Sequence, residues 1–422
     1  MWPQIRGPSC NPKSRRYKPP MRLADAVNGR PHLFAAAVAV VLSVATLFAG
    51  RAVAVQRERN TVAALAPELL PLKIQGAAFQ RAAAQTRDVL LFYGSSEVLG
   101  PKEWRAADFF RAAPTGFQVS AVGKPGATSL ILLQKIGALD RELRGKKVAI
   151  SLSSSWFLGN HSPYWYDGNF SRVAASALIF ASGLDVGLKR EIAARMIQYP
   201  RSLEETPLLE FALRRLASGN RLDELVFCAV SPLPKLEDAI FKLQDHFAAL
   251  RRLRGQKSSP PRHPQTLDWA ALIAKADAAS SVPEEEELTR VKPGRKQQAD
   301  SRDERFFRAR MNESLEWRDF ELLLRTLTEI HAQPLLISTP IDGRFYDAAG
   351  VSPSARQDFY QRIRALAQRY HFVLVDFQEH DEDIRFLDRR ELAKRHVHLS
   401  ARGWIFYDQL LDDFFHDRLP RP

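Results

Sequence analysis

Apolar and polar positions divide this chain into a short and a long part. Residues 33–50 read LFAAAVAVVLSVATLFAG, eighteen residues without a charge. In an α-helix they would rise about 27 Å, close to the thickness of a bilayer's hydrocarbon core. Beyond them, short apolar runs alternate with segments in which apolar residues recur every three or four positions. The sequence therefore predicts one membrane helix followed by a body of strands and helices.

The charges around the apolar run predict its orientation. Residues 1–32 hold seven Lys or Arg and one acid, 7 − 1 = +6, whereas Arg51 and Arg57 follow the run. Because positive flanks stay in the cytoplasm, we expect a basic cytoplasmic tail at 1–32, a single-pass anchor in the cell membrane at 33–54 and an extracytoplasmic body at 55–422. Residues 52–54 (Ala-Val-Ala) also resemble a signal-peptide cleavage site, but the long apolar run favours a retained anchor.

Five apolar runs in the body are typical of strands. They lie at 89–100, where the strand runs into a tight turn, and at 117–123, 146–153, 334–339 and 372–377. Segments with helical spacing lie at 61–88, 126–139, 315–332, 354–370 and 400–417. This alternation predicts an α/β fold with a parallel sheet flanked by helices. Residues of about 171–282, mostly with helical spacing, are interpreted as a helical insertion, and the charged segment of about 283–310 as a mobile surface segment.

The net charge of +13 does not indicate nucleic-acid binding. Nearly half of it lies in the N-terminal tail, and no zinc-ligand cluster, helix-turn-helix or aromatic RNA-binding motif is present. The two cysteines, Cys10 and Cys228, lie on opposite sides of the apolar run, so they cannot pair if that run spans a membrane. We expect no nucleic-acid partner, no cofactor and no disulfide framework.

Candidate chemistry begins where the first strand ends. Residues 94–97 read Gly-Ser-Ser-Glu. A serine on such a turn can present its hydroxyl to a cleft, and free N–H groups of the turn can stabilise an oxyanion. An N-capping serine on an ordinary strand-to-helix turn would have the same sequence. Gly123 ends the second strand and allows close approach of the backbone to a ligand, although an ordinary turn also explains it.

Histidines near the C-terminus supply a candidate base. Residues 396–400 read His-Val-His-Leu-Ser, directly before the final helix. A histidine in this place can act as general base towards a serine. His396 and His398 could also ligate a metal, but no third ligand is evident and we expect no metal site. A serine turn after the first strand, a glycine after the second and a late histidine is the chain order of SGNH (GDSL-type) hydrolases.

At this point the chain resembles the DltD family of D-alanyl-lipoteichoic acid biosynthesis proteins, from the anchor to the C-terminus. Residues 94–97 resemble the family's nucleophile block, and residues 315–319 its Glu-Tyr-x-Asp element. Residues 153–157 (Ser-Ser-Ser-Trp-Phe) resemble its Ser-Pro-Gln-Trp-Phe stretch, with Ser154 and Ser155 departing. The most specific blocks are residues 340–350, similar to Pro-Val-Asn-Gly-x-Trp-Tyr-Asp, and residues 398–404, similar to His-Leu-Gly-Trp-Lys-Gly-Trp.

The resemblance implies a fold, a reaction and partners. Family members have one membrane helix and an extracytoplasmic SGNH-like domain. They act with a membrane-bound O-acyltransferase and a D-alanyl carrier protein to move D-alanine onto an envelope polymer. By resemblance, Ser96 would attack an acyl ester or thioester and His398 would carry the proton. Gly123 and the Ser96 turn would hold the oxyanion, and Ser95 and Trp156 would line the site.

One position departs from the family. Its members carry an acid three residues before the histidine, where this chain has Arg395, and a cation cannot orient an imidazolium as a carboxylate does. Asp388 supplies the carboxylate if residues 389–395 are an insertion. Alternatively His396 substitutes for it, or the site is weakened.

Three functions are therefore compatible with the sequence. The first is D-alanyl transfer to an envelope polymer by a serine acyltransferase or thioesterase. The second is an O-acetyl esterase or acetyltransferase acting on exported polysaccharide, which would use the same serine and histidine. The third is a non-catalytic membrane scaffold for an O-acyltransferase, which Arg395 favours.

Overall fold

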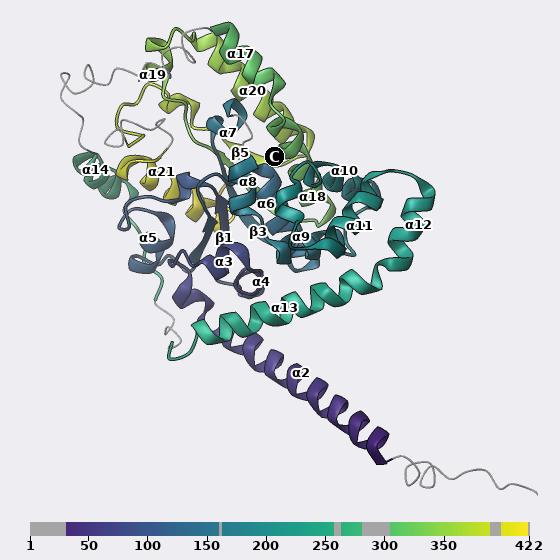
Figure 1. Ribbon diagram of the computed structural model, residues 1–422. Coiled ribbons are helices and arrows are strands. Elements are labelled where there is room, and N and C mark those ends of the chain that lie inside the picture. The colour runs from purple at the N-terminus through teal and green to yellow at the C-terminus, as the bar shows by residue number, and fades with distance from the viewer. Residues whose placement is uncertain (1–30, 160–162, 257–262, 281–303, 389–397, 421–422) are drawn as a thin grey trace, which may run out of the picture. The chain divides into compact units, whose positions relative to one another are not determined.

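The computed structural model describes residues 31–159, 163–256, 263–280, 304–388 and 398–420 (Figure 1). The chain divides into two units, Met1–Ala52 and Val53–Pro422. Within the first unit lies most of the apolar part of helix α2, Pro31–Leu65. Of the helices in the described part of the chain, α2 alone is long and apolar enough to cross a membrane. A single N-terminal apolar helix, as predicted, is thereby confirmed.

Helix α2 continues beyond the predicted anchor. Its last turns belong to the second unit, where Glu58, Thr61, Val62 and Leu65 are buried. The Glu58 carboxylate contacts the Nδ1 atom of His246 at 2.9 Å. The polar and apolar side chains of these turns are therefore part of the packing of the body.

The five predicted strands form one parallel sheet, which confirms the predicted α/β fold. They are β1 (Val89–Gly94), β2 (Gln118–Gly123), β3 (Lys147–Leu152), β4 (Gln333–Ser338) and β5 (Val373–Val375). Their order across the sheet is β2-β1-β3-β4-β5, and every neighbouring pair is parallel. All six residues of β1 are buried. Continuous apolar strands such as this one are expected when helices cover both faces of a parallel sheet.

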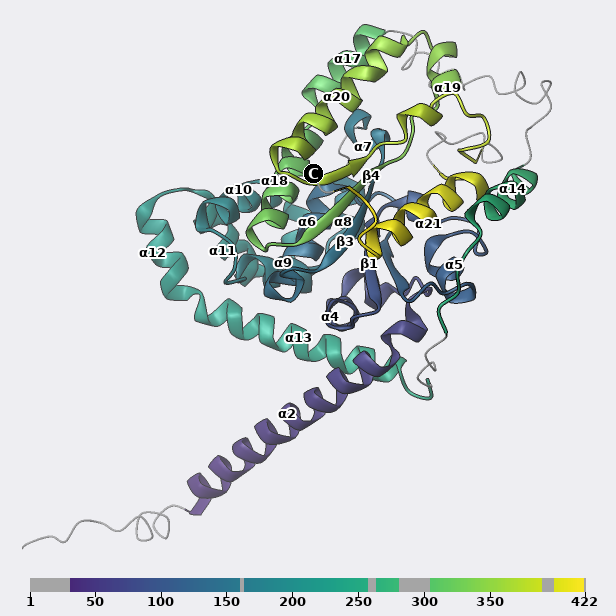
Figure 2. The ribbon, with the colours of Figure 1, turned by 180° about the vertical axis from the view of Figure 1, so that it is seen from behind.

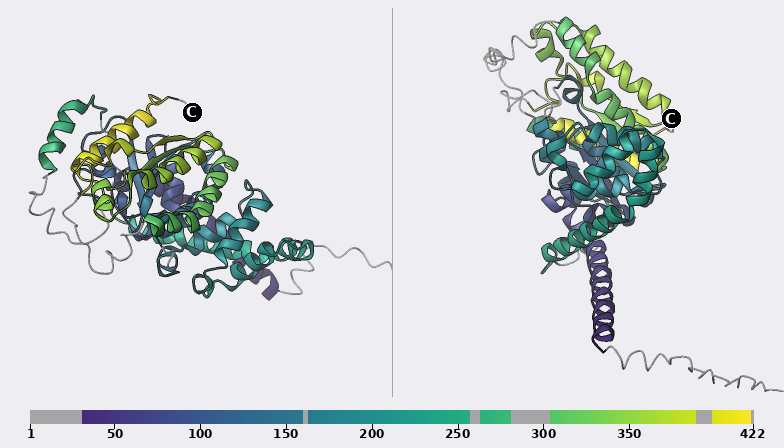
Figure 3. Two further views of the ribbon diagram at one scale, coloured as in Figure 1. Left: turned by 90° about the horizontal axis from the view of Figure 1, so that it is seen from above. Right: turned by 45° about the vertical axis from the view of Figure 1, so that its right-hand side comes forward.

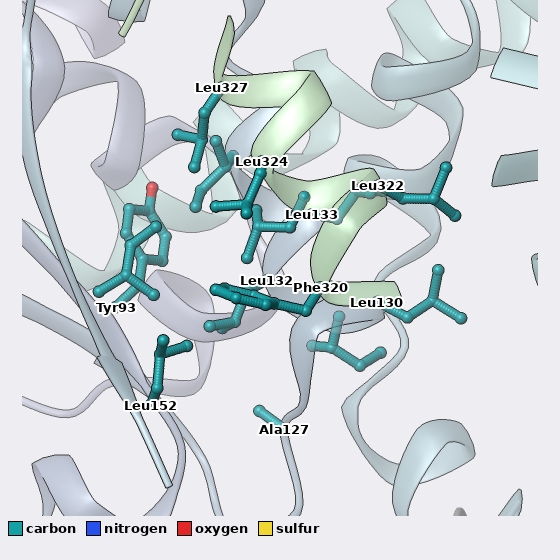
Figure 4. Packing of buried hydrophobic residues seen from close by; sticks show 14 of the residues in the cluster. Tyr93, Ala127, Leu130, Leu132, Leu133, Leu152, Phe320, Leu322, Leu324 and Leu327 are labelled. Atoms are coloured by element: carbon teal, nitrogen blue, oxygen red, sulfur yellow. The ribbon is translucent and has the colours of Figure 1, made fainter. Parts of the chain in front are cut away.

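Helices α6 (Ser129–Gly137) and α18 (Glu316–Glu329) cover one face of the sheet. Their leucines pack together with Phe320 against Tyr93 of β1 and Leu152 of β3 (Figure 4). Side chains alternate along a strand, so Val89, Leu91 and Tyr93 face this cluster while their neighbours face the other side. Helix α20 (Pro353–Arg369) adds Phe359 and Tyr360 to the same core.

The opposite face is covered by α5 (Ala106–Ala112) and the final helix α21 (Ala401–Phe415), seen in Figure 2. Leu90 and Phe92 of β1 pack here with Trp404. The Phe92 and Trp404 rings are arranged edge to face, with their centroids 6.5 Å apart. Helix α14 (Trp269–Ala279) lies beside α21 (Figure 3). The helix predicted at 400–417 is confirmed, and its apolar side secures it to the sheet.

The remaining helices surround this framework. They are α3 (Pro71–Gln75), α4 (Ala78–Gln85), α7 (Ser154–Leu158), α8 (Pro163–Asn169), α9 (Arg172–Ile179), α10 (Val186–Met196), α11 (Pro207–Ala217), α12 (Arg221–Val230), α13 (Pro232–Arg252), α17 (Glu304–Glu313) and α19 (Gly343–Ala348). Helices α9 to α14 occupy the segment interpreted as a helical insertion. Helix α17 begins at Glu304, so the end of the segment expected to be mobile is helical; residues 281–303 lie outside the described residues.

A buried ion pair joins the helical segment to a helix that covers the sheet. The guanidinium of Arg195 on α10 donates to both carboxylate oxygens of Asp319 on α18, at 2.7 and 2.9 Å. Both side chains are at most 1% exposed. The motif at 315–319 therefore has a structural role, because it joins two layers of helix.

Removing one partner of this pair tests its role. Asp319→Ala leaves a charged guanidinium buried without its carboxylate, and we expect the free energy of unfolding to fall by about 3–5 kcal/mol. The double variant Arg195→Met with Asp319→Leu buries no charge and should lose much less. Urea unfolding of the purified protein measures both values, and equal losses in the two variants would contradict this account.

Candidate active site

Two strands end on glycines at the same level of the sheet. Gly94 of β1 pairs with Gly123 of β2 at the last position of their register. A Cβ atom on Gly94 would lie 2.4 Å from Val98, and one on Gly123 would also lie 2.4 Å from Val98 and 2.8 Å from the Gly94 carbonyl oxygen. Any larger residue would push the turn away, so the two glycines allow the turn after β1 to fold over the ends of both strands.

The two serines of this turn differ in exposure. Ser95 is 3% exposed, and its hydroxyl donates to the Lys124 carbonyl at 3.3 Å. Ser96 begins a turn of 3₁₀-helix, Ser96–Val98, and its side chain is only partly buried. No hydrogen bond of the Ser96 hydroxyl is found within the described residues. Of the two hydroxyls, Ser96 is the one that a ligand can reach.

Glu97 stabilises the same turn from inside. Its Oε1 atom accepts a 2.6 Å hydrogen bond from the Ser95 N–H, and the side chain is 1% exposed. Burial raises the pKa of Glu97 to about 7, although the hydrogen bonds from Ser95 and from its own N–H oppose the shift. This role of the Glu97 carboxyl could not be predicted from the sequence, because a glutamate in a turn is usually solvated.

His398 and Asp388 are paired by a hydrogen bond between their backbones. Leu387 and Leu399 form an antiparallel bridge. On one side of the bridge the Asp388 N–H donates to the His398 carbonyl at 2.8 Å, and on the other the Ser400 N–H donates to the Phe386 carbonyl at 3.0 Å. Leu387 and Leu399 are buried in the core, and their packing fixes the positions of Asp388 and His398. The structure thus brings together two residues that are ten positions apart. Arg395 and His396 lie outside the described residues.

His398 and Ser96 lie at the same edge of the sheet. In the middle of α21, the Tyr407 hydroxyl lies 3.4 Å from the Ser151 hydroxyl near the end of β3. At the end of the helix, the Phe415 carbonyl accepts a hydrogen bond from Lys147 at the start of β3. The first turn of α21 therefore lies at the carboxyl edge. A Cβ atom on Gly100, just after the serine turn, would lie 2.1 Å from Nε1 of Trp404. Ligands of open parallel sheets bind at this edge.

Trp156 lies at the same edge but within the core. It follows β3 on α7, whose N-cap is Ser153, and the side chain of Ser153 accepts a hydrogen bond from the Ser155 N–H at 3.3 Å. The Trp156 side chain is 6% exposed and packs in the larger apolar cluster. It can therefore contribute little surface to the wall of a site.

An exposed tryptophan, which the sequence analysis missed, lies over the loop after Gly123. Gly126 in this loop has φ +82°, and a Cβ atom on it would lie 2.3 Å from the ring of Trp165. The Asn169 amide donates to the Pro125 carbonyl at 3.0 Å and so holds α8 on the loop. Trp165 is 48% exposed. The run of aromatic residues at 164–166 is the one sequence feature that could have drawn attention to it.

The family-like motif at residues 315–319 contacts the start of α6, the helix that follows this loop. The Glu316 carboxylate accepts the Ser129 N–H at 2.7 Å at the start of α6, and burial raises the pKa of Glu316 to about 8. The block at 340–350 is likewise held by buried polar contacts: the Ile341 N–H donates to the Tyr360 hydroxyl and to the Asp381 carboxylate, both at 2.8 Å. These motifs position the loops around the sheet's carboxyl edge.

The amino-acid sequence of this chain is similar to those of known proteins. A family model described as "DltD protein" matches residues 66–416. The chain is similar to "Protein DltD" of Bacillus subtilis (strain 168), with 24% identity over 392 residues that cover 91% of this chain and 94% of that protein. It is also similar to "Protein DltD" of Staphylococcus aureus, with 23% identity over 75% of this chain and 78% of that protein.

The buried Glu97 predicts a pH dependence. Its pKa of about 7 exceeds the ordinary value of 4.5, so its contribution to stability is complete below pH 4.5 and is lost as the pH rises through 7. Glu97→Gln keeps an acceptor for Ser95 but cannot ionise. As the pH rises from 4.5 to above 7, the free energy of unfolding of the variant should increase relative to that of wild type by up to about 3 kcal/mol. Urea unfolding at pH 4.5, 6 and 8 measures the difference, and parallel curves for the two proteins would contradict it.

Proposed function

This chain belongs to the DltD protein family, and from that premise we propose that it takes part in esterifying a cell-envelope polymer with D-alanine through an acyl-enzyme on Ser96. The observation that carries the proposal is the position of Ser96. It is the accessible serine of a turn that two facing glycines hold at the carboxyl edge of a parallel sheet, and His398 lies at the same edge.

The first half of the proposed reaction acylates the enzyme. The Ser96 oxygen attacks the carbonyl carbon of a D-alanyl ester or thioester, and a new C–O bond forms as the bond to the donor's oxygen or sulfur breaks. His398 takes the proton of the Ser96 hydroxyl and returns it to the leaving group. In the second half a hydroxyl of the polymer attacks the acyl-serine, and the same histidine moves its proton to Ser96.

Backbone groups would stabilise the charge on the carbonyl oxygen. The N–H groups of Ser96 and Gly123 are the proposed donors. The buried contact of Glu97 with the Ser95 N–H supports this role, because it fixes the turn before substrate arrives. Ser95 packs behind the turn, and Trp156 with the exposed Trp165 would line the approach to it.

Asp388 is the proposed orienting acid in place of the family's carboxylate. The backbone bond between Asp388 and His398 supports it, since it places the acid opposite the histidine although Arg395 stands at the family's position. A carboxylate in this place would orient the ring of His398 and stabilise its protonated form.

The proposal includes a location and partners. We propose that α2 is a retained single-pass anchor, with the basic tail in the cytoplasm and the body outside, because the positive residues precede the apolar segment. A membrane-bound O-acyltransferase and a D-alanyl carrier protein are the proposed partners, as the family resemblance implies, and the acceptor is an envelope polymer. An O-acetyl esterase and a non-catalytic scaffold remain the alternatives that the experiment below addresses.

An activated serine predicts reaction with a fluorophosphonate probe. We expect the purified protein to be labelled, Ser96→Ala to lose the label, and His398→Ala to be labelled about a hundredfold more slowly, the size expected for loss of a general base. Asp388→Asn should lower the rate less. In-gel fluorescence against time measures the rates.

Ser218→Ala is the matched control, because Ser218 is an exposed serine remote in sequence from the turn and its loss should leave labelling intact. Failure of the folded wild-type protein to be labelled would contradict the acyl-enzyme and favour the scaffold. Labelling on Ser96 combined with hydrolysis of acetylated polysaccharide, but not of D-alanyl esters, would favour the esterase.

A further inference from the structure

The helical segment carries an apolar surface that nothing in the described part of the chain covers. On α12 and α13 we define the apolar face as Leu222, Leu225, Leu233, Leu236 and Ile240. Their exposed fractions lie between 48% and 69%, and α12 has no buried residue. Exposed apolar surface of this extent marks contact with a protein or with a membrane.

The spacing of these residues forms a stripe. On α13 positions 233, 236 and 240 are three and four residues apart, and Phe247, 36% exposed, continues the series two turns later. Residues at such intervals share one side of a helix. The opposite side of α13 packs on the body, where Asp238, Asp245, His246 and Ala249 are buried.

Polar contacts fix α13 to the segment that follows the membrane-length run. His246 contacts Glu58 near the end of α2, and the Asp245 carboxylate accepts the Ala77 and Ala78 N–H groups, both at 2.8 Å. The apolar run ends at Gly50, so Glu58 is 58 − 50 = 8 residues beyond it in the same helix, about 12 Å at the helical rise. Chain connectivity therefore limits how far the part of α13 around His246 can lie from a bilayer that contains the run.

The charges beside the apolar face favour a lipid surface. The exposed Lys235, Arg251 and Arg254 make no ion pair with another described residue. Three of the acids on the same helices are paired, Asp223 with Arg215 at 2.6 Å, Glu224 with Arg190 at 3.2 Å and Asp238 with Lys242 at 2.5 Å, whereas Glu237 makes no ion pair with a described residue. An apolar stripe with uncompensated basic residues is typical of helices that lie in the interface of an anionic membrane.

We propose that the apolar face of α12 and α13 lies on the lipid surface of the membrane that holds α2, with Lys235, Arg251 and Arg254 among the headgroups. The contact gives the body a second attachment to the bilayer and restricts its rotation about α2. It is independent of the chemistry assigned to Ser96.

Site-directed spin labelling tests the contact in the full-length protein. Single cysteines are introduced by Leu236→Cys and Ile240→Cys in a Cys10→Ser, Cys228→Ser background, and the protein is reconstituted as one copy per nanodisc of phosphatidylcholine and phosphatidylglycerol in equal parts. Power saturation then compares collision with oxygen, which concentrates in lipid, and with a water-soluble nickel complex. We expect an oxygen-to-nickel ratio severalfold higher at both sites than at Leu315→Cys.

Leu315 is a matched control, since it is an apolar residue of the body, 45% exposed, outside the apolar face. Adding Leu222→Glu and Leu233→Glu should lower the ratio at position 236 to that of the control. A ratio at 236 and 240 equal to the control would overturn the proposal and leave a protein partner as the occupant. Exclusion of both reagents at these sites would overturn it as well, because it indicates burial against protein.

Discussion

The register between β1 and β2 is the constraint on which the candidate site depends. Both strands end on glycine at the same level, and Val98 packs against the two positions where side chains would otherwise stand. The turn therefore packs closely over the strand ends, with Ser95 buried and Ser96 partly exposed. Replacing either glycine with any L-residue would force Val98, and with it the serine turn, to move.

Buried charged and polar groups position the rest of the molecule around that turn. Glu97 fixes the turn itself, Glu316 binds the N-terminus of the helix that follows Gly123, and Asp319 joins the same helix layer to Arg195. Residues within the family-like motifs therefore have two kinds of role. Glu316 and Asp319 stabilise loops and layers, whereas Ser96 and His398 lie at the carboxyl edge of the sheet, where we propose that the reaction takes place.

Sequence reasoning predicted the sheet because its strands are apolar on both faces and end at glycine or turn residues, as β1 shows. The order of the strands was not predicted, since it depends on contacts between segments far apart in the chain. Trp165 was missed because an aromatic residue gives no sign in sequence of whether it lies inside or over a loop. The backbone pairing of Asp388 with His398 also depends on the buried Leu387 and Leu399, and no periodicity in the sequence reports such a pair. The long apolar helix was predicted, but its unbroken continuation to Leu65 was not, because the later turns are polar in part and become buried only by packing on the body, as Glu58 does beside His246.

The central claim is that Ser96 carries D-alanine on its way to the envelope. Its most direct test is the amount of D-alanine that mild alkali releases from the envelopes of cells in which the chromosomal copy encodes Ser96→Ala, with Ser218→Ala as the matched control and equal protein levels verified in the membrane. The account predicts that release falls to that of a deletion strain in Ser96→Ala and stays at the wild-type amount in Ser218→Ala. Wild-type release from Ser96→Ala cells would contradict it.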